Sequence, residues 1–246
     1  MSRWAGQYPL ALAVLASLLL CSVFISLLLG SADLSWPVLF AALQLSGEQP
    51  LAETIIWQLR LPRILTALLV GAGLAVSGAV LQNASRNPLA DPYLFGLMAG
   101  AALGATIVSI LLPEQQLSMA LGAFAGAMLA IALVLAVAFG QSRQRIEITL
   151  LAGVAVSFML SAISSFILYF AEPFAANKVI FWLMGSLSRS SWQSLVLIAP
   201  PVVLLLLLAV ALRRQLDALL LSDTSARSLG IRPQRLRLLL LISTAL

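Results

Sequence analysis

The sequence predicts an all-α membrane protein, a polytopic bundle of transmembrane helices. Hydrophobic residues make up 61% of the 246 residues and charged residues only 9%, and the mean hydropathy is +1.05. The apolar residues are gathered into runs of about 20, the length that crosses a bilayer as a helix. A soluble globule of this size needs far more polar surface than this chain can supply.

Six of these runs are long enough to span the bilayer, and a seventh is cut short. The six are residues 9–30, 64–82, 93–112, 117–139, 148–170 and 195–212. The seventh begins at Leu238 and stops at Leu246, which as a helix reaches only about 14 Å, half of the hydrocarbon thickness. We therefore expect residues 1–246 to be a single transmembrane domain, present in part. The first run is longer than the apolar core of a signal peptide and is kept as a span.

Basic residues in the short loops predict a cytoplasmic N-terminus. In that orientation ten basic residues fall in the cytoplasm and four outside, as the positive-inside bias requires. The four outside are Arg60, Arg63, Lys178 and Arg189. Arg60 and Arg63 stand where the second span is expected to begin, and a helix N-terminus disfavours cations. We expect a negative partner for both.

Composition excludes several kinds of site. The chain has no histidine and a single cysteine, Cys21, so disulfide frameworks, metal clusters and histidine-based catalysis are not expected. The basic residues are scattered without a patch, which excludes nucleic acid as a partner. None of the six spans contains Asp, Glu, Lys or Arg, although ion-coupled transporters normally place ionisable groups there. We expect no catalytic residue, no cofactor and no metal, and an energy source outside the chain.

Small residues at four-residue spacing predict close packing of the spans. Three such rows occur: Gly71, Ala75 and Ala79; Gly96, Gly100 and Gly104; and Gly122, Gly126 and Ala130. Rows of this kind let helix backbones approach where no hydrophobic driving force exists. They predict a compact bundle.

The sequence RNPLADP at residues 86–92 predicts a rigid elbow between two spans. Asn87 and Asp91 precede Pro88 and Pro92, and a residue before proline is pushed out of helical geometry. Asp91 can then cap the third span, with Pro92 at its first helical position. A well-made turn without further role is the alternative.

Residues 213–237, RRQLDALLLSDTSARSLGIRPQRLR, form a long basic segment. Ser222, Asp223 or Thr224 offers a cap, Gly230 a stop and Pro233 a new start, which predicts two short helices along the membrane face. Small side chains suit close docking of a partner, and the flanking arginines suit acidic neighbours or lipid head groups. A solvated basic loop is the alternative.

Four stretches carry a family resemblance. They are RLPRILTALLVGAGLAVSGAVLQNASRNPLADPYLFGLMAGAALGA, LLAGVAVS, FWLMGSLSRSSW and SARSLGIRPQRLR. In this order they resemble the permease family of type II ABC importers for iron-siderophores, haem and cobalamin. Residues 1–57 fit by position more than by motif. Members of that family have about ten spans, so the resemblance implies that this chain supplies the first part of a permease.

The resemblance implies a mechanism, partners and a location. A second permease subunit completes a central pathway, two cytoplasmic ATPases drive it, and an extracytoplasmic binding protein delivers a bulky metal chelate, all at the bacterial inner membrane. The second and fifth spans line the pathway, and residues 143–149 contribute to the gate. Arg60 and Arg63 meet acidic residues of the binding protein, and Pro62, at the first helical position, directs both arginines. The coupling helix that docks on the ATPase is Ser225, Ala226, Arg227, Ser228, Leu229 and Gly230.

Two other classes of protein compete with this interpretation. An ion-coupled secondary transporter of small solutes requires an ionisable residue inside a span, and an intramembrane enzyme requires a nucleophile and a base that face each other. The six spans offer neither arrangement. The sequence leaves open which chelate is carried and whether the permease is a homodimer or a heterodimer.

Overall fold

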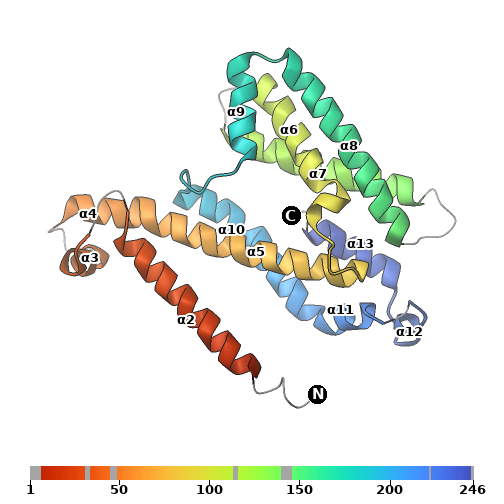
Figure 1. The fold of residues 1–246 in the computed structure, drawn as a ribbon, viewed down its shortest axis with the longest axis horizontal. Helices are drawn as coiled ribbons and strands as arrows, with labels where there is room; N and C mark the ends of the chain where they lie inside the picture. The colour runs from red at the N-terminus through yellow and green to blue at the C-terminus, as the bar shows by residue number, and fades with distance from the viewer. Residues whose placement is uncertain are drawn as a thin grey trace. The chain divides into compact units, whose positions relative to one another are not determined.

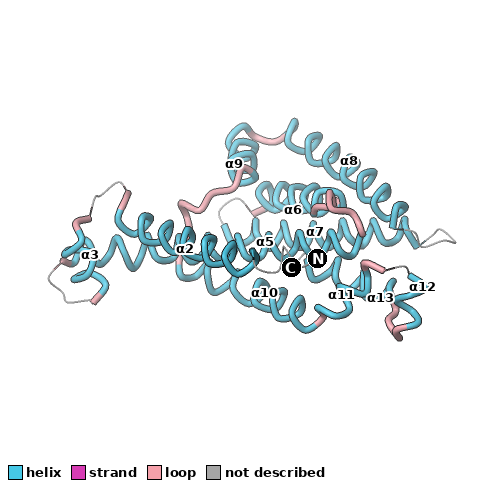
Figure 2. The backbone as a smooth tube through the Cα atoms, turned by 60° about the horizontal axis from the view of Figure 1, so that its bottom comes forward, coloured by secondary structure: helices cyan, strands magenta, loops and turns pink. Residues whose placement is uncertain are grey.

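The computed structural model describes residues 7–30, 34–44, 49–112, 116–139, 146–221 and 223–244. These residues form helices joined by loops, with no strand among them (Figure 2), which confirms the all-α prediction. The helices are α2 (Gln7–Leu28), α3 (Trp36–Leu43), α4 (Pro50–Thr54), the π-helix η1 (Ile55–Arg60), α5 (Leu61–Ser85), the 3₁₀-helix η2 (Pro92–Phe95), α6 (Leu97–Leu111), α7 (Gln116–Phe139), α8 (Ile146–Phe170), α9 (Pro173–Leu183), α10 (Trp192–Ala211), α11 (Arg213–Leu219), α12 (Asp223–Ser228) and α13 (Pro233–Thr244) (Figure 1).

Several of these helices can cross a membrane. Within the described part of the chain, five are long and apolar enough: Tyr8–Leu28, Pro50–Ser85, Met119–Ala138, Ile148–Phe170 and Trp192–Ala211. Helix α6 is apolar but shorter. The chain is therefore a multi-pass membrane protein, while the number of spans and the side of the N-terminus stay predictions.

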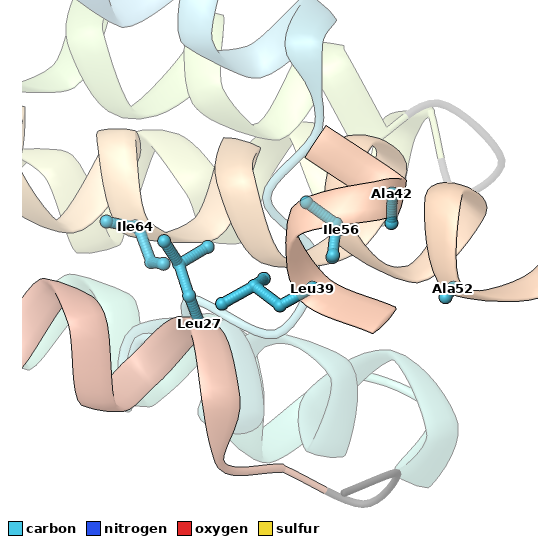
Figure 3. Packing of buried hydrophobic residues seen from close by; sticks show 6 residues of the cluster. All are labelled: Leu27, Leu39, Ala42, Ala52, Ile56 and Ile64. Carbon is cyan, nitrogen blue, oxygen red and sulfur yellow. The ribbon is translucent and has the colours of Figure 1, made fainter. Parts of the chain in front are cut away.

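The chain divides into two compact units. The first comprises residues 1–70 and 187–199. Its buried core is Leu27, Leu39, Ala42, Ala52, Ile56 and Ile64 (Figure 3). Two indole N–H groups also tie this unit together: Trp57 donates to the carbonyl of Ala42 at 3.1 Å, and Trp192 donates to the carbonyl of Trp57 at 2.8 Å. These bonds join α3, η1 and the start of α10.

The second unit, residues 71–186 and 200–246, is built on close packing of α6 against α7. A Cβ placed on Gly104 would lie 2.7 Å from the carbonyl carbon of Gly122, and one placed on Gly100 would lie 2.6 Å from the Cβ of Ala130. The predicted backbone approach is therefore confirmed for these two helices. A buried hydrogen bond of 3.1 Å between the hydroxyls of Thr106 and Ser164 joins α6 to α8.

The third predicted row of small residues does not pack in this way. Gly71, Ala75 and Ala79 are exposed on α5, and a Cβ added to Gly71 would meet nothing within 4 Å. The prediction of close packing is wrong for this row, because no described helix covers it.

Two further boundaries differ from the prediction. The third span was expected from residue 93, but Gly96 adopts a left-handed φ of 76° and separates η2 from α6. Residues 233–244 form one helix, α13, so the short helix expected at Pro233 and the stub expected at Leu238 are continuous. Helices α3 and α9 were not predicted.

Candidate functional site

Arg60 and Arg63 lie inside a helix and not at its beginning. The helix runs without interruption from Pro50 to Ser85, 36 residues, so the start expected near residue 64 is wrong. Its first turn carries Glu53, an acidic residue where the dipole favours one. The expected conflict between these arginines and a helix N-terminus therefore does not exist.

Pro62 also lies within this helix, and the backbone before it is π-helical. The N–H of Leu61 bonds to the carbonyl of Ile56, five residues earlier. A proline inside a helix clashes with the carbonyl of the preceding turn and donates no hydrogen bond. A wider π turn relieves this conflict. The prediction that Pro62 takes the first helical position is wrong, and its side chain is fully buried.

The guanidinium of Arg60 caps the end of α2. Its Nη1 donates to the carbonyls of Leu27 and Leu28, the latter at 3.0 Å. Carbonyls in the last turn of a helix have no partner within it, and a cation is favoured there. Gly30 leaves room for this contact, because a Cβ on it would lie 2.6 Å from Nη2 of Arg60. Arg60 is half-buried as a result.

Arg63 differs from Arg60 in its surroundings. Its side chain is exposed, and it makes no hydrogen bond or ion pair with any residue that the structure describes. Of the two arginines proposed for docking, Arg63 is the one with a guanidinium open to a partner.

The elbow between α5 and α6 forms largely as expected. Asp91 is extended, with φ −140° and ψ 169°, and its carboxylate accepts from the N–H of Leu94 at 3.1 Å. Pro92 takes the first position of the helix. The side chain of Asn87 accepts from the N–H of Leu89, beyond Pro88, at 2.9 Å. The capped helix is η2 and not the third span itself, which is the one correction here.

Helix α12 ends in a Schellman motif. The N–H of Ile231 bonds to the carbonyl of Ala226 at 3.1 Å, and the N–H of Gly230 bonds to the carbonyl of Arg227 at 2.9 Å. Gly230 has a φ of 78°, which glycine adopts without a Cβ clash. The predicted stop at Gly230 is confirmed. Of the three candidate caps, Ser222 lies outside the described residues, and the helix begins at Asp223.

Exposure divides the residues expected to couple to an ATPase. Ala226 is completely buried, so it holds α12 on the rest of the protein and is not available to a partner. The other five are exposed: Ser225, Arg227, Ser228, Leu229 and Gly230. Leu229, directly after α12, is 62% exposed, which makes it an apolar side chain open to the surroundings of that helix.

Sequence reasoning missed a cluster of three charged residues beside α12. The carboxylate of Asp223 accepts from Nη2 of Arg86 at 2.6 Å, and from Nη1 and Nη2 of Arg237 at 3.2 and 2.9 Å. Hydrogen bonding from Arg237 is the largest cause that lowers the pKa of Asp223 below its ordinary 3.8; burial opposes it, and Arg86 adds to the lowering. We call Arg86, Asp223 and Arg237 the arginine clasp.

The sequence profile described as the FecCD transport family matches residues 18–246. The chain belongs to the FecCD transport family. The predicted resemblance to permeases of this kind is confirmed.

The FecCD-family relatives are transport permeases. The chain is 34% identical over 244 residues to the molybdate import system permease MolB of Haemophilus influenzae, covering 96% of this chain and 71% of that protein. It is 38% identical over 215 residues to the cobalamin import system permease BtuC of Halobacterium salinarum, covering 86% and 58%. It is 40% identical over 190 residues to a probable iron chelatin transport permease of Helicobacter pylori, covering 76% and 56%. The chain thus spans less than two thirds of the last two relatives.

A solved structure of a transporter is also similar to this chain. It is described as an inward-facing conformation of a metal-chelate type ABC transporter. It matches with a TM-score of 0.84 and 33% sequence identity, over 97% of this chain and 73% of that one.

Two further predictions for this FecCD-family chain concern chemistry and gating. Among the described residues no group of three or more acidic or cysteine side chains could hold a metal ion. The expected gate, residues 143–149, lies partly outside the described part of the chain, and its remainder opens α8.

Proposed function

We propose that this chain is the permease subunit of an ATP-driven importer that carries a bulky metal chelate into the cytoplasm. The substrate class is a ferric siderophore, haem or cobalamin, and the site of action is the bacterial cytoplasmic membrane. The family match over residues 18–246 carries the proposal. Helices α2, α6, α7 and α10 contain no Asp, Glu, Lys or Arg, which favours an external energy source over ion coupling within them.

Reconstitution tests this proposal and its competitor together. The transporter, assembled from the permease, its ATPase and its binding protein, is placed in proteoliposomes and offered radiolabelled cobalamin, a ferric hydroxamate, haem and molybdate. We expect uptake of one chelate that needs internal ATP and the binding protein, and that a protonophore does not change. Uptake that proceeds without ATP and collapses with the protonophore would support an ion-coupled secondary transporter instead.

The proposed assembly has a second permease subunit, two cytoplasmic ATPases, an extracytoplasmic binding protein and surrounding lipid. With the N-terminus in the cytoplasm, residues 213–237 face the ATPases as a coupling segment. The exposed side chain of Leu229, directly after α12, offers an apolar anchor, and apolar anchors that become buried on binding carry much of the energy of an interface. We do not expect the permease itself to hydrolyse ATP.

A bulky substitution on α12 tests the coupling contact. Ser228→Trp is preferable to a change at Gly230, because any side chain at a φ of 78° is strained regardless of a partner. We expect Ser228→Trp to reduce ATPase co-purification about tenfold while membrane insertion is kept. Leu15→Trp, on an exposed face of α2, is the matched control and should co-purify normally. Equal co-purification of both variants would remove α12 from the ATPase interface.

Docking of the binding protein is proposed at Arg63, with Arg60 beside it in the same helix. Exposed cations steer an acidic partner and fix its register, and their contribution is strongest at low salt. Arg63→Glu should weaken binding-protein affinity about tenfold at low ionic strength, with a smaller loss at high salt. Arg232→Glu makes the same change in net charge in the segment proposed to be cytoplasmic and should have no effect. An affinity of Arg63→Glu that stays unchanged at low salt would leave lipid phosphates as its partner.

A further inference from the structure

Arg86 adopts a backbone conformation that glycine normally supplies. Its φ is 53°, and it is the one residue other than glycine with a positive φ in the described part of the chain. It closes α5 in a Schellman motif, with the N–H of Asn87 bonded to the carbonyl of Gln82 at 3.1 Å and the N–H of Arg86 bonded to that of Asn83 at 3.3 Å. An L side chain is disfavoured in this conformation. The side chain of Arg86 must therefore be held there by contacts that glycine could not make.

Those contacts, together with the contacts of Arg237, join the four helices α5, α11, α12 and α13. Nε of Arg86 donates to the carbonyl of Leu219 at the end of α11, and Nη2 donates to Asp223 at the start of α12. Arg237, in α13, donates from Nε to the carbonyl of Ala84 in the last turn of α5 at 2.9 Å. Its two Nη atoms hold the same Asp223 carboxylate.

The charges agree with the helix ends they meet. Each arginine lies at the C-terminal carbonyls of a helix, where a cation is favoured, and Asp223 lies in the first turn of α12, where an anion is favoured. The side chain of Arg237 is only 10% exposed, and a buried arginine needs a charged partner. Two bonds to one carboxylate fix direction as well as distance.

Helix α12 depends on external contacts for its position. It has six residues, too few for a helix to be stable by itself. Two of the contacts that tie it to the rest of the second unit are the buried side chain of Ala226 and the clasp at Asp223. A force on α12 therefore reaches α5 through Arg86 and Arg237.

We propose that the arginine clasp positions α12 and transmits its displacement to the end of α5. This inference rests on the proposed function, in which α12 receives the movement of an ATPase and α5 lines the pathway. Arg86 and Arg237 are positioning residues and touch neither substrate nor nucleotide. The three residues of the clasp thus have a role in addition to that of the coupling segment itself.

Arg86→Gly is the sharpest variant, because it removes the clasp contact and at the same time relieves the left-handed backbone. We expect the variant to unfold at the wild-type temperature or above and to co-purify with its ATPase. Uptake per ATP hydrolysed, measured in proteoliposomes with the chelate that the wild-type transporter imports, should fall at least tenfold. Arg86→Lys keeps a cation within reach of Asp223 and should recover part of this ratio.

Controls separate the possible failures. Arg189→Gly removes an exposed arginine from a turn of the first unit and should keep the wild-type ratio. A wild-type transporter that shows no ATP-dependent uptake would refute the proposed function, whereas a normal ratio in Arg86→Gly would refute the clasp alone. Loss of uptake in step with loss of thermal stability or of ATPase binding would also overturn the inference, because it would make Arg86 a folding or docking residue.

Discussion

Alanine substituted for glycine on α6 and on α5 should have opposite effects on stability. At Gly104 the new Cβ would overlap the carbonyl group of Gly122, with 2.7 Å to its carbon, and would lie 3.1 Å from Cα of Gly126. These are backbone atoms of α7, which cannot rotate away, so the helices must separate by about 1 Å to reach van der Waals contact. Overpacking of this kind costs typically 1–3 kcal/mol, and rigid backbone neighbours favour the upper value.

The matched control is Gly71→Ala, because a Cβ there would meet nothing within 4 Å. We expect it to be neutral or slightly stabilising, since alanine is the better helix former. A loss of about 3 kcal/mol at Gly104 corresponds to a fall in melting temperature of roughly 6–12 °C for a chain of this length. Thermal unfolding in detergent, followed by tryptophan fluorescence, measures both variants. Melting temperatures that agree within a degree would refute the close approach of α6 and α7.

Three further outcomes are expected. Asp223→Asn should lower the melting temperature at neutral pH. The folded pKa of Asp223 lies below its ordinary value of 3.8, so its stabilisation is fully present above the unfolded value and is lost as the pH falls through the folded one. In a pH series of thermal scans the difference from wild type should therefore persist at about pH 5 and shrink progressively below about 3.8. Arg60→Gln should destabilise the first unit by about 1–2 kcal/mol, because it uncaps α2. We expect faster proteolysis near Gly30 and a smaller loss of binding-protein affinity than in Arg63→Glu. Unchanged proteolysis together with a larger loss of affinity than in Arg63→Glu would refute the cap. Thr106→Val should lower the free energy of unfolding by about 0.6 kcal/mol, because it breaks the hydrogen bond to Ser164. If the fall in melting temperature of the double mutant with Ser164→Ala equals the sum of the two single falls, the hydrogen bond is refuted.

Hydropathy predicted the start of a long helix to within two residues where the helix is an unbroken apolar run. Helix α7 was expected from residue 117 and begins at Gln116, and α8 was expected from residue 148 and begins at Ile146. It failed at Pro50–Arg60, where Glu53 and Gln58 interrupt the apolar pattern and a proline follows. Backbone hydrogen bonding does not require apolar side chains, so a helix can continue where hydropathy ends. No pattern in the sequence marks the π turn that accommodates Pro62.

The candidate site was predictable where it depends on neighbours in sequence. The stop at Gly230 and the cap at Asp91 follow from local rules for glycine and for Asp before proline. The clasp does not, because Arg86 and Asp223 are 137 positions apart and each looks ordinary in its own segment. A positive φ at an arginine is likewise invisible in a sequence. Only the fold brings these residues together.

The contacts within the clasp restrict the order in which its three residues can be substituted during evolution. Arg86 can be replaced by glycine first, since glycine suits the backbone there and Asp223 keeps Arg237. Asp223 cannot be lost first without leaving the buried guanidinium of Arg237 with no counter-charge. Related permeases should therefore retain all three residues, or have glycine in place of the first, and seldom lack the aspartate while they keep the buried arginine. Covariation between these columns of a family alignment is the trace that such a dependence would leave.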